Sequence, residues 1–166
     1  MNLPIPLKLV PANHPLLHAK LQPVDDPRDP DIKDIAAAML ETVHIYHGIG
    51  LSANQVGLNL RIFVVNHQRE YVFINPEVVF VTKRTELSAE GCLSLPGIFG
   101  QVHRSWALRL TAHDRVGQHF KLYAQGTLAF TIQHELDHLN GVLFTERTEK
   151  LGLGRATWEK IHGRST

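Results

Sequence analysis

The sequence has almost no excess of charge of either sign, a single cysteine and no long apolar run. Lysine and arginine number 17 against 16 aspartates and glutamates, which leaves a net charge of +1 over 166 residues. A protein without a basic excess has no electrostatic reason to bind nucleic acid or an anionic membrane surface. We therefore expect neither as a partner.

The lone cysteine, Cys92, has no second cysteine with which to form a disulfide inside the chain. A fold that does not depend on oxidation suits a reducing cytosol. No apolar stretch approaches the roughly 18 residues of a membrane span. The proline-containing N-terminus resembles neither a secretory signal nor an arginine-rich transit peptide. The sequence thus predicts a cytoplasmic protein of bacterial type.

The length predicts a single domain over residues 1–166. Asp29 and Pro30 predict the start of a helix that Gly48 would stop. Its apolar face would comprise Ile32, Ile35, Met39, Val43 and Tyr46. A second helix is predicted over residues 126–141, with Gly141 after its end and a buried stripe of Leu128, Ile132, Leu136 and Leu139. A helical turn at residues 14–20 and a short last helix over Ala156–Ile161 are also indicated.

Alternating apolar residues predict strands between these helices. They cover residues 61–66 and 71–75 across a turn at 67–70, residues 77–83 after Pro76, and a hairpin of 106–114 and 117–125. A further strand would carry Cys92 and end at Pro96. The predicted fold class is α+β, with short antiparallel strands packed around a central helix, one N-terminal helix and a short C-terminal helix.

The predicted central helix contains "HELDH", residues 134–138. Two histidines four residues apart lie on one helix face about one turn apart, so both imidazoles can reach one metal ion. Glu135 lies to the side, where it can act as a base toward water. Asp137 is either an acceptor for an imidazole N–H or a solvated helix charge. The pattern indicates a metal-dependent hydrolase.

A third ligand must come from elsewhere, and Cys92 in "LSAEGCLSLPG" is the leading candidate. A lone cysteine is usually a small buried apolar residue, but the histidine pair favours a ligand role. One cysteine and two histidines leave a tetrahedral ion one open position, as in catalytic sites. Glu90 and Arg104 would either form an ion pair that braces this strand or leave Arg104 solvated.

A third segment, "GIGLSANQVG" at residues 48–57, contains closely spaced glycines. It lacks the third glycine of a dinucleotide-binding loop. The glycines either cap the first helix or leave bare backbone that can pair with an extended peptide. In the second interpretation Gln55 would donate a neutral amide N–H to an oxyanion.

Together the three segments resemble the peptide deformylase family. The family patterns are G-φ-G-φ-A-A-x-Q, E-G-C-φ-S and H-E-φ-D-H, where φ is apolar. They stand here as "GIGLSANQ" at 48–55, "EGCLS" at 90–94 and "HELDH" at 134–138. The order and spacing agree over nearly the whole chain. One position departs, because Ser52 takes the place of the first alanine, where it could alter loop packing or substrate affinity.

The resemblance implies a hydrolase that removes the formyl group from N-formylmethionyl nascent peptides at the ribosome and releases formate. Cys92, His134 and His138 would bind ferrous iron, with zinc, nickel or cobalt able to occupy the same site. Glu135 would take a proton from water and pass it to the leaving amine. The amide of Gln55 and the backbone N–H of Leu93 would hold the formyl oxygen, and Gly50 would hydrogen-bond the substrate backbone.

Geometry adds further expectations. Phe130 lies one turn before His134, and together with Ile49 it would line an apolar pocket for methionine. The alternative for Phe130 is plain packing in the core. A thiolate-bound ferrous ion is oxidisable, so activity should be lost in air and preserved by nickel. Two other functions remain to be compared: a general metallopeptidase with a different third ligand, and a binder of nascent N-termini that does not need Glu135.

Overall fold

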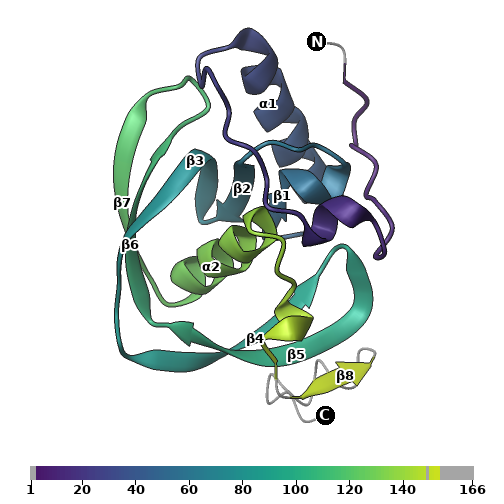
Figure 1. The fold of residues 1–166 in the computed structure, drawn as a ribbon, viewed down its shortest axis with the longest axis vertical. Coiled ribbons are helices and arrows are strands. Elements are labelled where there is room, and N and C mark those ends of the chain that lie inside the picture. The colour runs from purple at the N-terminus through teal and green to yellow at the C-terminus, as the bar shows by residue number, and fades with distance from the viewer. Residues whose placement is uncertain (1–2, 149, 154–166) are drawn as a thin grey trace.

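The computed structural model describes residues 3–148 and 150–153 (Figure 1). It has an α+β fold, as predicted. The predicted C-terminal helix over residues 156–161 lies outside the described residues. The helical turn predicted near the N-terminus is present as η1 (Pro15–His18). Two further 3-10 turns are η2 (Ala53–Val56) and η3 (Phe144–Glu146). Within the described ranges, no helix is long and apolar enough to cross a membrane.

The first helix, α1 (Pro30–Ile45), begins where the sequence predicts, because the Asp29 carboxylate accepts a hydrogen bond of 2.8 Å from the backbone N–H of Asp31. Its end differs from the prediction. His47, not Gly48, takes the left-handed conformation, with φ of 53°. The N–H of Gly48 then donates to the carbonyl of Val43 at 2.9 Å, which closes the helix. Tyr46, predicted on the buried face, lies past the last helical residue and is 39% exposed.

The second helix, α2 (Thr127–Leu139), carries the "HELDH" segment. Gly141 follows its end with φ of 72°, and the N–H of Val142 donates to the carbonyl of Asp137 at 2.9 Å. These features confirm the predicted glycine stop. Ile132, Leu136 and Leu139 are buried as predicted, whereas Leu128 is only half-buried against the core.

Eight strands form two antiparallel sheets in the described part of the chain. The five-stranded sheet has the order β1-β2-β3-β6-β7 and the three-stranded sheet the order β4-β5-β8. The strands are β1 (Gly50–Ser52), β2 (Ile62–His67), β3 (Arg69–Val81), β4 (Thr85–Cys92), β5 (Leu95–Ser105), β6 (Ala107–His113), β7 (His119–Gln125) and β8 (Leu151–Leu153). The predicted hairpin of β6 and β7 is confirmed.

The two strands predicted at 71–75 and 77–83 are a single strand, β3. Asn75, with φ of 50°, bends the strand where the pairing to β6 shifts register. The Asn75 side chain exchanges two hydrogen bonds of 2.8 Å with the backbone of Val24, which stabilises the bend. Pro76 follows directly, at a place where a missing N–H is tolerated. The strands were also expected to be short, yet β3 has 13 residues and β5 has 11.

The prediction that Pro96 ends the cysteine-bearing strand is wrong. The strand β4 ends at Cys92 itself, and Pro96 is the second residue of β5. The two strands form a hairpin in which Cys92 pairs with Leu95 across a two-residue turn. The strands β5 and β8 were not predicted from the sequence.

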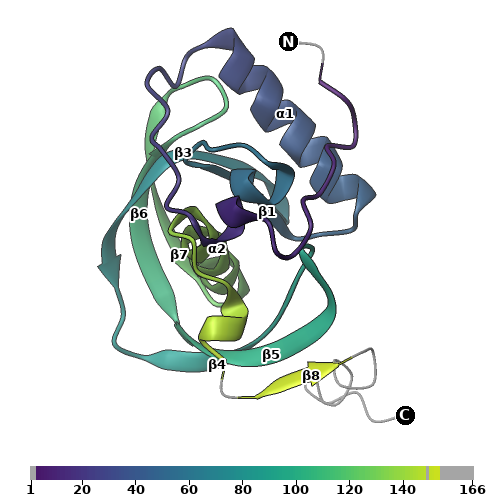
Figure 2. The same ribbon diagram turned by 45° about the vertical axis from the view of Figure 1, so that its right-hand side comes forward.

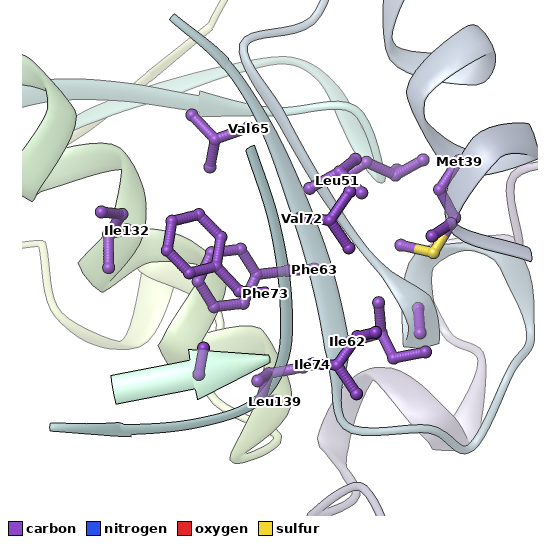
Figure 3. Packing of buried hydrophobic residues seen from close by; sticks show 14 of the residues in the cluster. Met39, Leu51, Ile62, Phe63, Val65, Val72, Phe73, Ile74, Ile132 and Leu139 are labelled. Carbon is purple, nitrogen blue, oxygen red and sulfur yellow. The ribbon is translucent and has the colours of Figure 1, made fainter. Parts of the chain in front are cut away.

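Helix α2 lies between the two sheets, where it contacts β1, β2 and β7 of one and β5 of the other. Figure 2, which shows α2 nearer to end-on, places the helix between β6–β7 and β4–β5. The other face of β1 and β2 is covered by α1, so β2 is buried on both sides. Met39 of α1 lies on one side of the strands and Ile132 of α2 on the other (Figure 3).

Candidate active site

A cleft of about 700 Å³ lies where three elements meet. The cleft is lined by residues 48–50, which lead into β1, by residues 88–92 of β4 and by one face of α2. The strand β1 is the last strand of its sheet, and β4 is the last strand of the other. The cleft therefore runs between two sheet edges, with the "HELDH" helix at its base.

Cys92 and His134 line this cleft, and His138 lies next to them. Their ligand atoms all lie within 4.8 Å of one another, and Cys92 Sγ is 3.2 Å from His138 Nε2. The two imidazole centroids are 5.0 Å apart, as expected for residues one turn apart. Three such donors fit one divalent ion with an open fourth position. The sequence prediction of which residues come together thus agrees with the geometry.

The two histidines differ in protonation. Burial, with the positive charge of His134 nearby, lowers the pKa of His138 well below its ordinary value. His138 is therefore neutral, which is the form that binds a metal. Burial also acts to lower the pKa of His134, but hydrogen bonds to Cys92 and Glu90 outweigh it and leave that pKa raised. Metal binding would displace this proton.

Glu90 fixes the orientation of His134. Its Oε2 lies 2.9 Å from His134 Nδ1, so Nε2 of the imidazole faces the cysteine. Arg104 donates to both oxygens of Glu90, at 2.7 and 2.9 Å. Burial alone would raise the pKa of Glu90, but the bonds from Arg104 and His134 lower it to about 2. Of the two alternatives for Arg104, the ion pair is therefore the observed one, and its side chain is 4% exposed.

Asp137 is neither the acceptor for an imidazole N–H nor the solvated helix charge that the sequence left as alternatives. It is 8% exposed and accepts from Arg104 Nη1 at 2.5 Å. Arg147 donates to both of its carboxylate oxygens, at 2.5 and 2.7 Å. The imidazole acceptor near the ligands is thus Glu90. Arg147 was missed by sequence reasoning, because nothing in its local sequence "TERTEK" indicates a buried partner.

Glu135 is 3% exposed and faces the cleft. Burial raises the pKa of its carboxyl group, while the nearby His134 charge opposes that rise. Ser52 donates from its hydroxyl to Glu135 Oε2 at 2.7 Å. A Cβ on Gly50 would lie 2.4 Å from Glu135 Oε1, so only glycine leaves room for this carboxylate.

Gln55 lies in η2 and is 1% exposed. The backbone N–H of Ser52 donates to its Oε1 at 2.7 Å, which fixes the amide orientation. Its Nε2 then points toward Cys92 Sγ and Ser94 Oγ, at 3.3 and 3.2 Å. Leu93 follows Cys92 in the β4–β5 turn and also lines the cleft. An amide donor therefore lies directly beside the cysteine.

The walls of the cleft are largely apolar. Ile49, which is 50% exposed, and Phe130 both line it. Phe130 is held edge-on against Trp106, with ring centroids 6.0 Å apart. At Gly91, next to the cysteine, the space that a side chain would need is filled by the ring of Phe99. A Cβ there would lie 2.7 Å from that ring.

Comparison with known proteins places these features in one family. A family model described as polypeptide deformylase matches residues 6–153. The peptide deformylase of Stutzerimonas stutzeri is 39% identical over 162 residues, covering 94% of this chain and 96% of that protein. A crystal structure of a peptide deformylase from Synechococcus elongatus in complex with actinonin has a TM-score of 0.84 and 34% identity, covering 96% of this chain and 85% of that one. The Thermotoga maritima peptide deformylase has a TM-score of 0.84 and 33% identity, covering 90% and 100%.

Proposed function

This chain belongs to the polypeptide deformylase family, whose enzymes remove the N-formyl group from nascent polypeptides, and we propose how its cleft performs that reaction. The observation that carries the proposal is the convergence of Cys92, His134 and His138 beside the Glu135 carboxylate. A hydrolase needs an electrophile, a base and a donor for the developing oxyanion. Each has a candidate residue or residue group within this cleft.

Cys92, His134 and His138 are the proposed metal ligands, and ferrous iron is the proposed ion. When bound, the ion would supply a Lewis acid and make water reactive near neutral pH. The chemistry of one thiolate and two imidazoles also suits zinc, nickel or cobalt. The burial of Glu90 behind His134 supports this assignment, because ligating histidines usually donate their second N–H to a carboxylate or carbonyl.

Glu135 is the proposed general base. It would accept a proton from the attacking water and deliver it to the leaving amine nitrogen, so that formate and a free N-terminus are released. Its buried position supports this role, because burial raises its pKa toward the working pH, where a carboxylate both accepts and returns a proton well. The Ser52 hydroxyl and the open space at Gly50 hold the carboxylate at the cleft.

The formyl oxygen gains negative charge as water adds to the formyl carbon. The proposed donors to that oxygen are Gln55 Nε2 and the backbone N–H of Leu93. The fixed orientation of the Gln55 amide supports this role. The backbone N–H of Ser52 already holds Oε1, so Nε2 needs no rearrangement during the reaction. Donors fixed in advance contribute most to catalysis of this kind.

The substrate backbone is proposed to enter as an extended segment between the edges of β1 and β4, with Gly50 as a hydrogen-bonding partner. Edge strands offer N–H and C=O groups that lack a neighbouring strand, and peptides often bind by adding to such an edge. Ile49 and Phe130 would contact the methionine side chain. Their position on the apolar wall of the cleft supports this assignment.

The proposed catalytic unit is a single domain over residues 1–166, which the packing of α2 against both sheets supports. Action at the ribosome follows from a nascent chain as substrate. A cytoplasmic location is supported by the lone cysteine, which as an iron ligand must stay reduced.

The test is formate release from a formyl-Met-Ala-Ser peptide by anaerobically purified protein of measured metal content. Replacement of Glu135 with alanine should reduce turnover by about 10²–10⁴-fold with the metal retained. Glu41→Ala, which removes an exposed carboxylate from α1, should leave turnover unchanged. Cleavage of internal peptide bonds without formate would contradict the reaction, and full turnover by Glu135→Ala would contradict the role of the base.

A further inference from the structure

Ser52 stands where the family pattern has its first alanine, and its hydroxyl is part of the site. The residue is 0% exposed. Its Oγ lies 2.7 Å from Glu135 Oε2 and 3.1 Å from the backbone carbonyl of Glu135. A hydroxyl has one proton to donate, and the shorter contact goes to the carboxylate. Hydrogen bonds to a charged acceptor are the stronger kind.

Two residues of β1, Gly50 and Ser52, lie next to the Glu135 side chain. Gly50 and Ser52 are two positions apart, so they face the same side of the strand. Ser52 holds Oε2 by a hydrogen bond, whereas Gly50 leaves the space that Oε1 occupies, because a Cβ there would lie 2.4 Å from it. The two carboxylate oxygens thus meet different parts of the same strand.

Ser52 does not line the cleft, whereas Gly50 and Glu135 do. The serine lies behind the carboxylate, so it has no surface to offer a substrate. Any effect of its hydroxyl on the reaction must pass through Glu135 or through folding. Its backbone N–H serves Gln55 separately, and that bond does not depend on the side chain.

We propose that Ser52 is a positioning residue, whose hydroxyl anchors Oε2 of Glu135 and leaves Oε1 as the oxygen that exchanges protons at the cleft. Glu135 carries the proton in each transfer, and the serine keeps its own. If the Glu135 carboxylate could rotate freely, it would spend less time in the orientation that accepts a proton from water. Such misorientation of a catalytic group lowers the rate of the chemical step and leaves substrate affinity unchanged. The inference rests on the proposed role of Glu135 as the base.

The first variant is Ser52→Ala, which removes only the hydroxyl from a buried site. We expect kcat for formyl-Met-Ala-Ser to fall about tenfold, which corresponds to about 1.4 kcal/mol, the lower range for a hydrogen bond to a charged group. KM and the affinity for the product Met-Ala-Ser, measured by calorimetry, should stay within about twofold. Metal content should stay unchanged. An unchanged kcat, or equal losses in kcat and product affinity, would overturn the proposal.

Thr42→Val is the matched control for the loss of a buried hydroxyl. Thr42 is also 0% exposed, and its hydroxyl donates to the carbonyl of Ala38 at 2.6 Å and accepts from the N–H of Leu7 at 2.9 Å. It lies on α1, outside the cleft. The variant should lower the melting temperature without changing kcat. If it lowers kcat as much as Ser52→Ala does, the effect of Ser52 comes from folding, and the proposal fails.

A double variant separates positioning from other effects. Glu135→Asp keeps a carboxylate but shortens it by one methylene, so the bond to Ser52 is lost. In that background Ser52→Ala should have no further effect on kcat, since the two changes share one interaction. A second tenfold loss would overturn the proposal. Wild-type protein that releases no formate would instead overturn the proposed function, and this inference with it, before any variant is compared.

Discussion

Replacement of Arg104 with methionine tests whether the buried ion pairs of Arg104 with Glu90 and Asp137 stabilise the fold and the site. Arg104 is 4% exposed and lies between Glu90 and Asp137, with hydrogen bonds of 2.7, 2.9 and 2.5 Å to their carboxylates. Methionine has a similar length but no charge. The substitution leaves Glu90 buried beside a single remaining partner, His134, and leaves Asp137 with Arg147.

The expected loss of folding stability follows from the two buried carboxylates that lose their hydrogen bonds to Arg104. Removal of one partner of a buried ion pair typically costs about 3–5 kcal/mol, because the remaining charge has lost its compensation. For a chain of this size each kcal/mol lowers the melting temperature by about 2–4 °C, so a fall of roughly 6–20 °C is expected. Metal affinity should also fall by about 10–100-fold, as is usual when a group that orients a ligand is disturbed.

The assay combines thermal unfolding of metal-free protein with a chelator competition for the loaded protein. Arg84→Met is the matched control, because Arg84 pairs with Glu86 but is 65% exposed. An exposed pair contributes about 0–1 kcal/mol, so the control should melt close to wild type and keep its metal affinity. Equal losses in the two variants would refute the reasoning that burial makes the Arg104 network important.

Two further predictions concern neighbouring residues. Gly50→Ala should lower formate release, because its Cβ would lie 2.4 Å from Glu135 Oε1. Gly48→Ala, whose Cβ would meet the movable Leu93 side chain at 3.0 Å, should retain most activity, and similar losses in both would contradict the steric argument. In metal-free protein Glu90, with a pKa lowered to about 2 from 4.5, stabilises the fold above pH 4.5, and that contribution is lost as the pH falls toward 2. Glu90→Gln should therefore flatten the pH dependence of the unfolding free energy over this range, and parallel curves for the two proteins would contradict the assignment.

The convergence of Cys92, His134 and His138 could be predicted from the sequence. His134 and His138 share a helix face by periodicity alone, whereas Cys92 was chosen because it is the lone cysteine and because the segment around it resembles the family pattern. The acceptor for His134 could not be chosen in this way. Asp137 is nearer in sequence, but its carboxylate leaves α2 on a side where two arginines meet it. Which acid faces an imidazole depends on tertiary packing, which the sequence pattern does not contain.

The partner of Arg104 also could not be predicted from the sequence, even with the strand register known. In the β4–β5 hairpin the residue directly opposite Arg104 is Glu86, while Glu90 lies opposite Gly100. A prediction based on cross-strand partners would therefore pair Arg104 with the wrong glutamate. The observed pair forms because Arg104 reaches along the strand to the buried end of the hairpin, where Asp137 also needs a cation. Glu86 is left to the exposed Arg84.

The burial of α2 explains why its buried polar side-chain atoms have partners, with His138 Nδ1 as the exception. Six consecutive residues, 134–139, are buried, so this part of the helix has no solvated face on which polar groups could lie. A helix enclosed in this way is normally apolar all round. Polar side chains persist there only when partners offset the loss of water. His134 has Glu90, Glu135 has Ser52, Asp137 has two arginines, and His138 faces Cys92. An apolar stripe alone could not reveal this arrangement, because the polar residues of "HELDH" are as deeply buried as the apolar residue among them.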